Sequence, residues 1–468
     1  MLKSILIANR GEIARRIIDF VVESFILKNA RSLTRSATAE QILGPQKSVL
    51  VANSESAQFR VQPRRRERPE TSEYFLELAA YRVVPNATAP RFLIPIASRG
   101  SILRSLQIYN AQRLLARLGK RLLSTAVGVE LAKVFLRDVA SVSIRRDISR
   151  ARWGSLILQE HLKDLFGLDS LTLSVSLGTP GVHQKPLLQV MDQKGKILGY
   201  VKVGWNGETI ELVQREKSAL SSLEHRRFST AAVPRVIHAG WWRERYLLIQ
   251  EAPQSRSDDS LQNITDQHLQ FLLELHSTNP SCSQLQESKF VRGLQRRLAF
   301  LRSSGFTYYG HLLQLAFSGC NDRLGNAEIP FGFRHGDFTP WNILFTCDKL
   351  FVVDWEYAQQ LSLPGWDLFH FIIQTAVLVR GRSAGQIYEN FTQQGQNHEY
   401  VHAYLQELGI SPDLAGPLLS LYLVDVLSWY LCRDGRRVSA KGEALRRTWR
   451  GLLTLLLLGG KPLAWGEH

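Results

Sequence analysis

The segment FRHGDFTPWNILF, residues 333–345, decides the fold of this chain. Its apolar residues surround three polar ones, His335, Asp337 and Asn342. Burying such side chains costs free energy unless each has a hydrogen-bonding partner or a chemical task. A carboxylate followed five residues later by an amide, in a setting otherwise suited to a core, therefore predicts a functional site.

The residues after this segment extend the site. Pro340 predicts a loop between Asp337 and Asn342 rather than a helix. The runs NILF and LFVV, joined by TCDK, predict a hairpin, and Asp354 follows its second strand. Two carboxylates and an amide at the ends of one hairpin are hard oxygen ligands, which suit Mg²⁺ together with substrate phosphates. One aspartate remains as a general base. The alternative is that all three are solvated loop residues.

The pattern HGDxxxxN, followed by an apolar strand and an Asp, resembles the catalytic core of the aminoglycoside phosphotransferase and choline kinase-like enzymes, relatives of protein kinases. The resemblance implies that Asp337 accepts the proton of an attacking hydroxyl and that Asn342 and Asp354 hold Mg²⁺. It also implies that His335 braces the loop and that Asp367, in PGWDLFHF, is structural. HGDFTPWN is similar, in addition, to phosphotransferase-like proteins linked to bacterial surface-polysaccharide synthesis.

A phosphate-binding lysine is expected upstream. Lys202 lies in GYVKVG, whose alternating apolar residues predict a half-buried strand. The resemblance implies that Lys202 grips the nucleotide phosphates and that Glu216, on the following predicted helix, pairs with it. Glu208 and Glu211 are alternative partners on that helix. The alternative for Lys202 is a solvated lysine on an edge strand.

The remaining kinase-like signals are weaker. SLGTPGVHQ stands where a nucleotide loop belongs, with Gly178 and Gly181 as its glycines, but it departs from GxGxxG and could form only a hairpin turn. YLLIQEA resembles the hinge strand that passes adenine. Together these segments predict an α+β, protein-kinase-like two-lobe fold, with a β-rich N-lobe at 151–255 and a helical C-lobe at 256–468. Residues 1–150 would form a basic, mostly helical region before it.

Positive charge is concentrated in that first region. Of the chain's 58 Lys/Arg and 42 Asp/Glu, residues 1–150 hold 26 and 12, a net of +14. Leucine spacing predicts a helix over 98–139, with Arg113, Arg117 and Arg121 on one face. We expect residues 78–139 to contact an anionic membrane surface; the alternative is a helix packed on the small lobe. The first 19 residues resemble only the opening of biotin carboxylase.

These observations predict an ATP- and Mg²⁺-dependent phosphotransferase that moves the γ-phosphate to a hydroxyl of a small molecule, such as a sugar or polysaccharide-related compound. The alternative is a pseudokinase or a membrane-associated scaffold that binds nucleotide without turnover. Four scattered cysteines and no apolar run of membrane-spanning length predict a cytoplasmic protein, peripheral at the inner face of the membrane. No motif predicts nucleic-acid binding.

Overall fold

The computed structural model describes residues 59–64, 73–84, 91–97, 99–105, 138–177, 185–253, 262–325, 327–346, 348–392, 396–435 and 439–459. The chain divides into two compact units. The first comprises Met1–Lys217 and Arg235–Ala252, and the second comprises Ser218–Pro234 and Pro253–His468. Each unit is described by itself.

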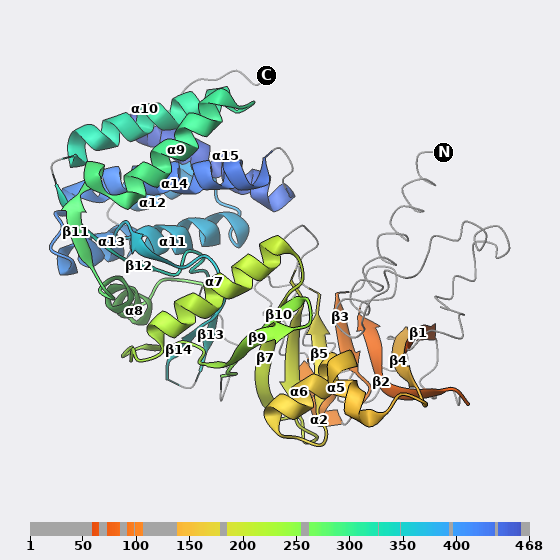
Figure 1. Ribbon diagram of the computed structural model, residues 1–468. Coiled ribbons are helices and arrows are strands. Elements are labelled where there is room, and N and C mark those ends of the chain that lie inside the picture. Colours follow the sequence, from red (N-terminus) through yellow and green to blue (C-terminus); the bar gives the residue numbers. More distant parts are fainter. Residues whose placement is uncertain are drawn as a thin grey trace. The chain divides into compact units, whose positions relative to one another are not determined.

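An antiparallel sheet forms the centre of the first unit (Figure 1). Its strand order, within the described residues, is β1-β4-β2-β3-β5-β6-β7-β10-β9. The strands are β1 (Phe59–Arg64), β2 (Phe75–Val84), β3 (Phe92–Pro95), β4 (Val139–Arg145), β5 (Thr172–Ser176), β6 (Leu187–Met191), β7 (Ile197–Gly204), β9 (Val236–Trp242) and β10 (Arg245–Gln250). Every pairing along this sheet is antiparallel.

Short helices accompany the sheet. They are α2 (Arg99–Ser105), α5 (Trp153–Leu156) and α6 (Leu158–Phe166), preceded by a 3₁₀ turn at Arg150–Arg152. Leu158 and Leu162 of α6 are buried with the apolar side chains of β5, β6 and β7, and this cluster is the core of the unit. Helix α6 ends at Gly167, whose φ of +63° favours a residue without Cβ.

The last part of the sheet carries the kinase-like pattern that the sequence predicted. Strands β5, β6 and β7 are followed by a helix, α7 (Gly207–Leu223), and then by β9 and β10, with β10 inserted beside β7. At the start of α7 the Asn206 side chain accepts a hydrogen bond of 2.8 Å from the Thr209 backbone N–H, which satisfies one of the free donors of the first turn.

The predicted N-terminal region needs a correction. Four strands, β1 to β4, provide most of its described regular structure, and they continue the same sheet across residue 150. The described part of residues 1–150 is therefore mainly strand, with the seven-residue α2 as its α-helix, and the prediction of a mostly helical region is not tested as a whole because most of these residues lie outside the described ones. The sequences of β2 and β4 show no clear alternation of apolar and polar residues. The leucine spacing of 98–139 was the stronger pattern in this region, and it favoured helix. Arg113, Arg117 and Arg121 lie outside the described residues.

The second unit is mainly helical. Its helices are α8 (Asp266–His276), α9 (Lys289–Ser303), α10 (Thr307–Leu324), α11 (Trp366–Leu378), α12 (Ala384–Thr392), α13 (Gln396–Glu407), α14 (Ala415–Asp434) and α15 (Ala440–Leu457). Two small sheets accompany them: β11 (Ser281–Gln284), β12 (Glu328–Arg334) and β15 (Gln359–Ser362) form one, and β13 (Ile343–Phe345), β14 (Leu350–Val352) and β8 (Ala231–Ala232) form the other. The predicted hairpin is present as the antiparallel pair β13 and β14.

Helix α14 runs through the middle of this unit and contacts α9, α10 and α15 (Figure 1). Within the described residues, the stretch Pro412–Asp434 is long and apolar enough to cross a membrane by length and composition, which the sequence reading did not expect. Most of its side chains are buried against neighbouring helices, as in the core helix of a globular unit. By itself, the length of this helix is weak evidence for a membrane span.

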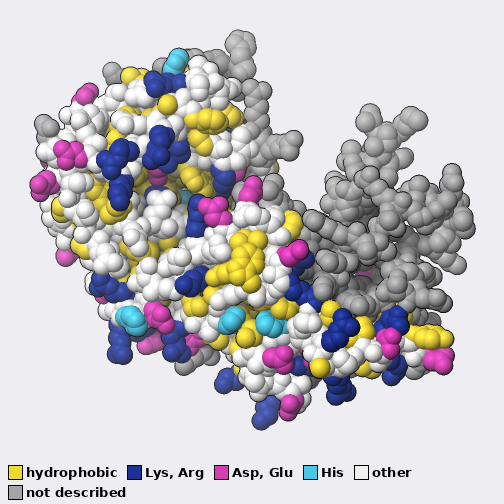
Figure 2. Space-filling view, viewed as in Figure 1, with side chains coloured by type: hydrophobic (Ala, Val, Ile, Leu, Met, Phe, Trp, Pro, Cys, Tyr) yellow, Lys and Arg dark blue, Asp and Glu magenta, His cyan; other side chains and the backbone are white. Residues whose placement is uncertain are grey.

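The α+β class predicted from the sequence is confirmed, since one unit is built on a sheet and the other on helices. On the face seen in Figure 2, the described basic side chains are interspersed with acidic ones. Such a mixed surface agrees with the small net charge of residues 151–468.

Candidate active site

The first unit holds a buried ion pair. Lys202 on β7 reaches Glu216 on α7, with its Nζ 2.7 Å from Oε1 and 2.6 Å from Oε2. The Glu216 side chain is fully buried. Buried charges of this kind persist only when they are paired and hydrogen-bonded. The predicted pairing of Lys202 with Glu216 is therefore confirmed, although its nucleotide-binding role stays a prediction.

The alternative partners of Lys202 are excluded by position. Glu211 pairs with Arg215 on the exposed side of α7, and Glu208 lies exposed in the first turn. A residue that the sequence reading missed completes the pair: Gln250, the last residue of β10, donates a hydrogen bond of 2.8 Å to Glu216 Oε1. Gln250 could have been predicted from its place in YLLIQEA, at the end of the predicted hinge strand.

The loop between β12 and β13 holds the catalytic motif of the second unit. His335 is buried, and its Nε2 lies 3.0 Å from the carbonyl oxygen of Val353. Its Nδ1 accepts a hydrogen bond of 3.2 Å from the Asp337 backbone N–H, and Trp355 packs edge-on against the ring. This geometry agrees with the bracing role expected for His335.

Asp367, at the start of α11, fixes the backbone of the same loop. Its two carboxylate oxygens accept the backbone N–H groups of His335, at 2.7 Å, and Gly336, at 2.9 Å. Gly336 has a φ of +85°, and a Cβ there would lie 2.2 Å from the carbonyl oxygen of Tyr357. Only glycine fits this close approach, so the HGD sequence is required by backbone geometry as well as by chemistry.

Asp337 presents a partly exposed carboxylate, with a quarter of its side chain accessible. The Asn342 side-chain amide donates hydrogen bonds to Asp337 Oδ2, at 2.8 Å, and to its backbone carbonyl, at 2.9 Å. Because the Asn342 Nδ2 faces Asp337, the amide oxygen of Asn342 points away from Asp337. The five-residue spacing thus serves two purposes: it orients the aspartate and frees an oxygen ligand.

The residue after β14, Val353, pairs with the backbone of Asn342. The Val353 backbone N–H donates to the Asn342 carbonyl oxygen at 2.9 Å, so the next residue, Asp354, follows directly beside it. Asp354 has a φ of +74°, a conformation that non-glycine residues rarely adopt. Strained backbone of this kind is concentrated at functional sites.

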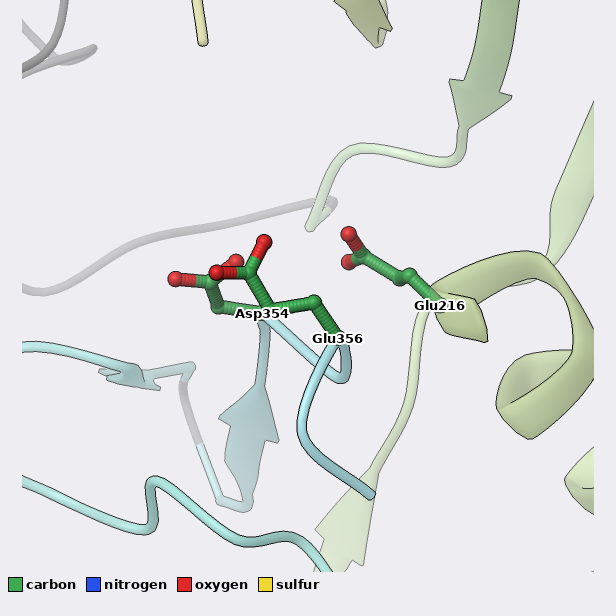
Figure 3. A group of neighbouring side chains, drawn as sticks. All are labelled: Glu216, Asp354 and Glu356. Carbon is green, nitrogen blue, oxygen red and sulfur yellow. The ribbon is translucent and has the colours of Figure 1, made fainter. Parts of the chain in front are cut away.

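Figure 3 shows Asp354 and Glu356 extending from the loop after β14, with Glu216 on α7 labelled as well. Glu356 is buried, and the sequence analysis did not predict it as a site residue. The donor set that this loop and Asn342 supply consists of two carboxylates and an amide oxygen. These are the ligands that Mg²⁺ prefers, so the residues fit that ion.

Another missed residue is His370, on α11. Its Nε2 lies 3.3 Å from Asp337 Oδ1. The signal was present in PGWDLFHF, because Asp367 and His370 are three apart on a helix and so share a face. The two predicted glycines of the nucleotide loop, Gly178 and Gly181, lie outside the described residues.

A family model described as "Phosphotransferase enzyme family" matches residues 201–408. None of the curated proteins compared with the sequence matches it. Solved structures are similar at low identity. An ADP-bound aminoglycoside phosphotransferase is 14% identical, with 63% of this chain and 97% of that chain covered and a TM-score of 0.39. The choline kinase LicA from Streptococcus pneumoniae is 16% identical, with 64% and 99% covered and a TM-score of 0.42.

The family match includes Lys202, Glu216, the catalytic loop and Asp354. It confirms the family that the motifs predicted for this segment, and with it the class of enzyme, a phosphotransferase.

Proposed function

We propose that this chain, whose residues 201–408 match the model of the phosphotransferase enzyme family, transfers the γ-phosphate of Mg-ATP to a hydroxyl group of a small neutral polyhydroxyl compound, such as a sugar. The observation that carries the proposal is the exposure of the Asp337 carboxylate and the identity of its neighbours. Its carboxylate is partly exposed, accepts a hydrogen bond from the Asn342 amide and lies 3.3 Å from the His370 Nε2, with no Lys or Arg of the described residues of this unit paired to it. A carboxylate in this setting can take up the proton of an acceptor hydroxyl.

The other residues have matching tasks. Asn342, Asp354 and Glu356 would hold Mg²⁺, which neutralises charge on the transferred phosphoryl group. Lys202, oriented by Glu216 and Gln250, would bind the nucleotide phosphates. His335 and Asp367 keep the loop in place. Transfer then needs only that Asp337 Oδ1 or Oδ2 receive the hydroxyl proton as the acceptor oxygen attacks.

Aromatic side chains near Asp337 support a neutral acceptor. Burial raises the pKa of Tyr430 to about 12, and the negative charge of Asp337 contributes, which places the phenol within electrostatic reach of the base. The Arg433 guanidinium covers the rings of Trp429, at 4.3 Å, and Tyr430, at 4.5 Å. The Arg433 guanidinium, which also pairs with Asp434, covers these ring faces, so they are not free to bind a cationic acceptor by a cation–π contact.

The experiment is a screen for phosphate transfer from radiolabelled Mg-ATP to three acceptor sets: neutral sugars and polyols, choline-like cations, and aminoglycosides. The proposal expects labelled product only with the first set and none for Asp337→Asn. Transfer to a cationic acceptor would overturn the choice of substrate class. A protein that binds ATP but transfers phosphate to no set would favour the pseudokinase alternative.

The cytoplasmic location and the membrane contact through residues 78–139 remain proposals. Most of that segment lies outside the described residues, and its described part joins the sheet through β2 and β3. Vesicle co-sedimentation tests the contact. Binding should require anionic lipid, weaken as salt rises and fall when Arg113, Arg117 and Arg121 become glutamine. Equal recovery on neutral and anionic vesicles would remove the proposal.

A further inference from the structure

His370 occupies a fully enclosed position beside the catalytic loop. Its side chain is 2% exposed, and the ring of Trp366 stacks on it with centroids 4.8 Å apart and an interplanar angle of 17°. Its Nδ1 lies 3.1 Å from the Tyr422 hydroxyl, and its Nε2 lies 3.3 Å from Asp337 Oδ1. The Gln374 amide reaches the same Nε2 at 3.4 Å, the outer limit of a hydrogen bond.

The Tyr422 hydroxyl is the contact that bears on which ring nitrogen of His370 carries the proton. Burial raises the pKa of Tyr422 well above its ordinary value, so its hydroxyl keeps its proton at neutral pH. A phenol that donates to Nδ1 leaves the ring's own proton on Nε2. That N–H then points at Asp337 Oδ1.

The two carboxylate oxygens of Asp337 are therefore held from two directions. Asn342 donates to Oδ2 from within the loop, and the His370 Nε2 on α11 lies within hydrogen-bond distance of Oδ1. The same helix holds the loop backbone through Asp367, one turn earlier. One rigid element thus fixes both the main chain and the side chain of the catalytic aspartate.

Resting on the proposed function, we propose that His370 is a positioning residue for phosphoryl transfer. In its neutral form, its Nε2–H donates to Asp337 Oδ1 and stops the carboxylate from turning away from the acceptor hydroxyl. Its own orientation is set by the Tyr422 hydroxyl and by the Trp366 ring. An uncharged donor holds the base in place without pairing it with a full positive charge, so the base keeps its affinity for a proton.

The first test compares two substitutions of similar size. His370→Gln keeps an N–H donor near the position of Nε2, and His370→Leu fills the space without one. The measured rate is ADP release from Mg-ATP, with the acceptor found by the screen. We expect His370→Leu to lower kcat roughly 10- to 100-fold, as small displacements of catalytic groups do, with little change in KM for ATP. His370→Gln should recover most of that loss.

A matched control is His268→Gln on α8. His268 is equally buried and packs against Phe338 of the same loop, but no described contact joins it to Asp337. Its loss should lower the melting temperature and leave kcat unchanged. If His370→Leu has the kcat of the wild type, or if His370→Gln falls as far as His370→Leu, the positioning role is refuted and only packing remains.

A second measurement does not depend on turnover. Nitrogen NMR of ring-labelled histidine in the full chain, with His370→Gln used for assignment, reports the tautomer directly. We expect the Nε2–H form and a changed Nε2 signal in Asp337→Asn. An Nδ1–H form, or identical signals in both proteins, overturns the inference. A wild type that never releases ADP would instead refute the proposed function, and the NMR result would still decide whether His370 holds Asp337.

Discussion

Asp337 and Asp425 are two aspartates of the same unit with opposite surroundings. Asp425, on α14, is almost fully buried and bonds to the guanidinium groups of Arg297 and Arg334 and to the Trp366 indole N–H. Asp337 is partly exposed, and among the described residues of this unit its side chain is bonded only by Asn342 and His370. Arg334, one of the two arginines that pair with Asp425, directly precedes the HGD motif that contains Asp337.

The different surroundings separate an aspartate that anchors the structure, Asp425, from one that can accept a proton, Asp337. Burial by itself would raise the pKa of Asp425, but the charges of Arg297 and Arg334 and the bonds from Arg334 and Trp366 outweigh it and lower the pKa. A carboxylate so strongly paired is a poor proton acceptor and a good anchor. A carboxylate held by neutral donors keeps the capacity to accept a proton. Glu216, paired with Lys202 in the other unit, belongs with the anchors.

The largest effect is expected at the reacting carboxylate. Asp337→Asn removes the general base, a contribution of about 10²–10⁴-fold in rate. The asparagine side chain has nearly the same size and can still form hydrogen bonds. Turnover should fall by that factor, and the affinity for Mg-ATP measured by calorimetry should stay the same. An unchanged transfer rate would remove the distinction between the two aspartates.

Removing the carboxylate of the anchor, Asp425, should act on stability instead. Asp425→Ala leaves two arginines facing an emptied buried site, and breaking a buried ion pair by removing one partner costs about 3–5 kcal/mol. Chemical denaturation should show this loss in the free energy of unfolding. If Asp425→Ala folds normally yet loses activity, then Asp425 takes part in the reaction and the comparison fails.

The pH dependence of stability sharpens the comparison. Because the pKa of Asp425 is lower in the folded state, its stabilising contribution is complete above the unfolded value, about 3.9, and is lost as pH falls through the folded value. Asp425→Asn should therefore lower stability at neutral pH and flatten its decline below about pH 4. A variant whose stability still falls as steeply as the wild type over that range would show that another group causes the acid transition.

Removing the cation of an anchoring pair should affect nucleotide use. Lys202→Ala leaves the buried Glu216 with Gln250 as its remaining named donor. Losing a hydrogen-bonded charge contact to phosphate costs about 1.5–3 kcal/mol, or roughly 10- to 100-fold. KM for ATP should rise and turnover should fall, in steady-state assays over a range of ATP concentrations. Unchanged ATP kinetics would leave the Lys202 pair as a purely structural feature.

Much of this arrangement was readable from local patterns. HGDxxxxN and the apolar runs after it predicted the loop and the hairpin, because spacing along one or two elements fixes those contacts. The alternation in GYVKVG predicted only the strand of Lys202, and its pairing with Glu216 was predicted from the family resemblance. Asp425 and His370 were not predicted, since their partners come from α9, β12 and the catalytic loop, far away in sequence. The strands β1 to β4 were missed for a similar reason: their pairing with one another and with β5 decides their structure more than their own sequences do.

The smallest expected effect compares two glutamates of α7. Glu216→Gln should weaken ATP use as Lys202→Ala does, but less, because the neutral amide still accepts a hydrogen bond from Lys202. Glu211 is a matched control on the same helix, where it forms an exposed i,i+4 pair with Arg215. Such pairs are worth about 0.3–0.5 kcal/mol and are screened by salt. Glu211→Gln should therefore leave KM for ATP and the melting temperature nearly unchanged, measured side by side with Glu216→Gln. The opposite ranking would mean that the buried pair is not the one that serves the nucleotide, and Glu211 would replace Glu216 as the functional partner on this helix.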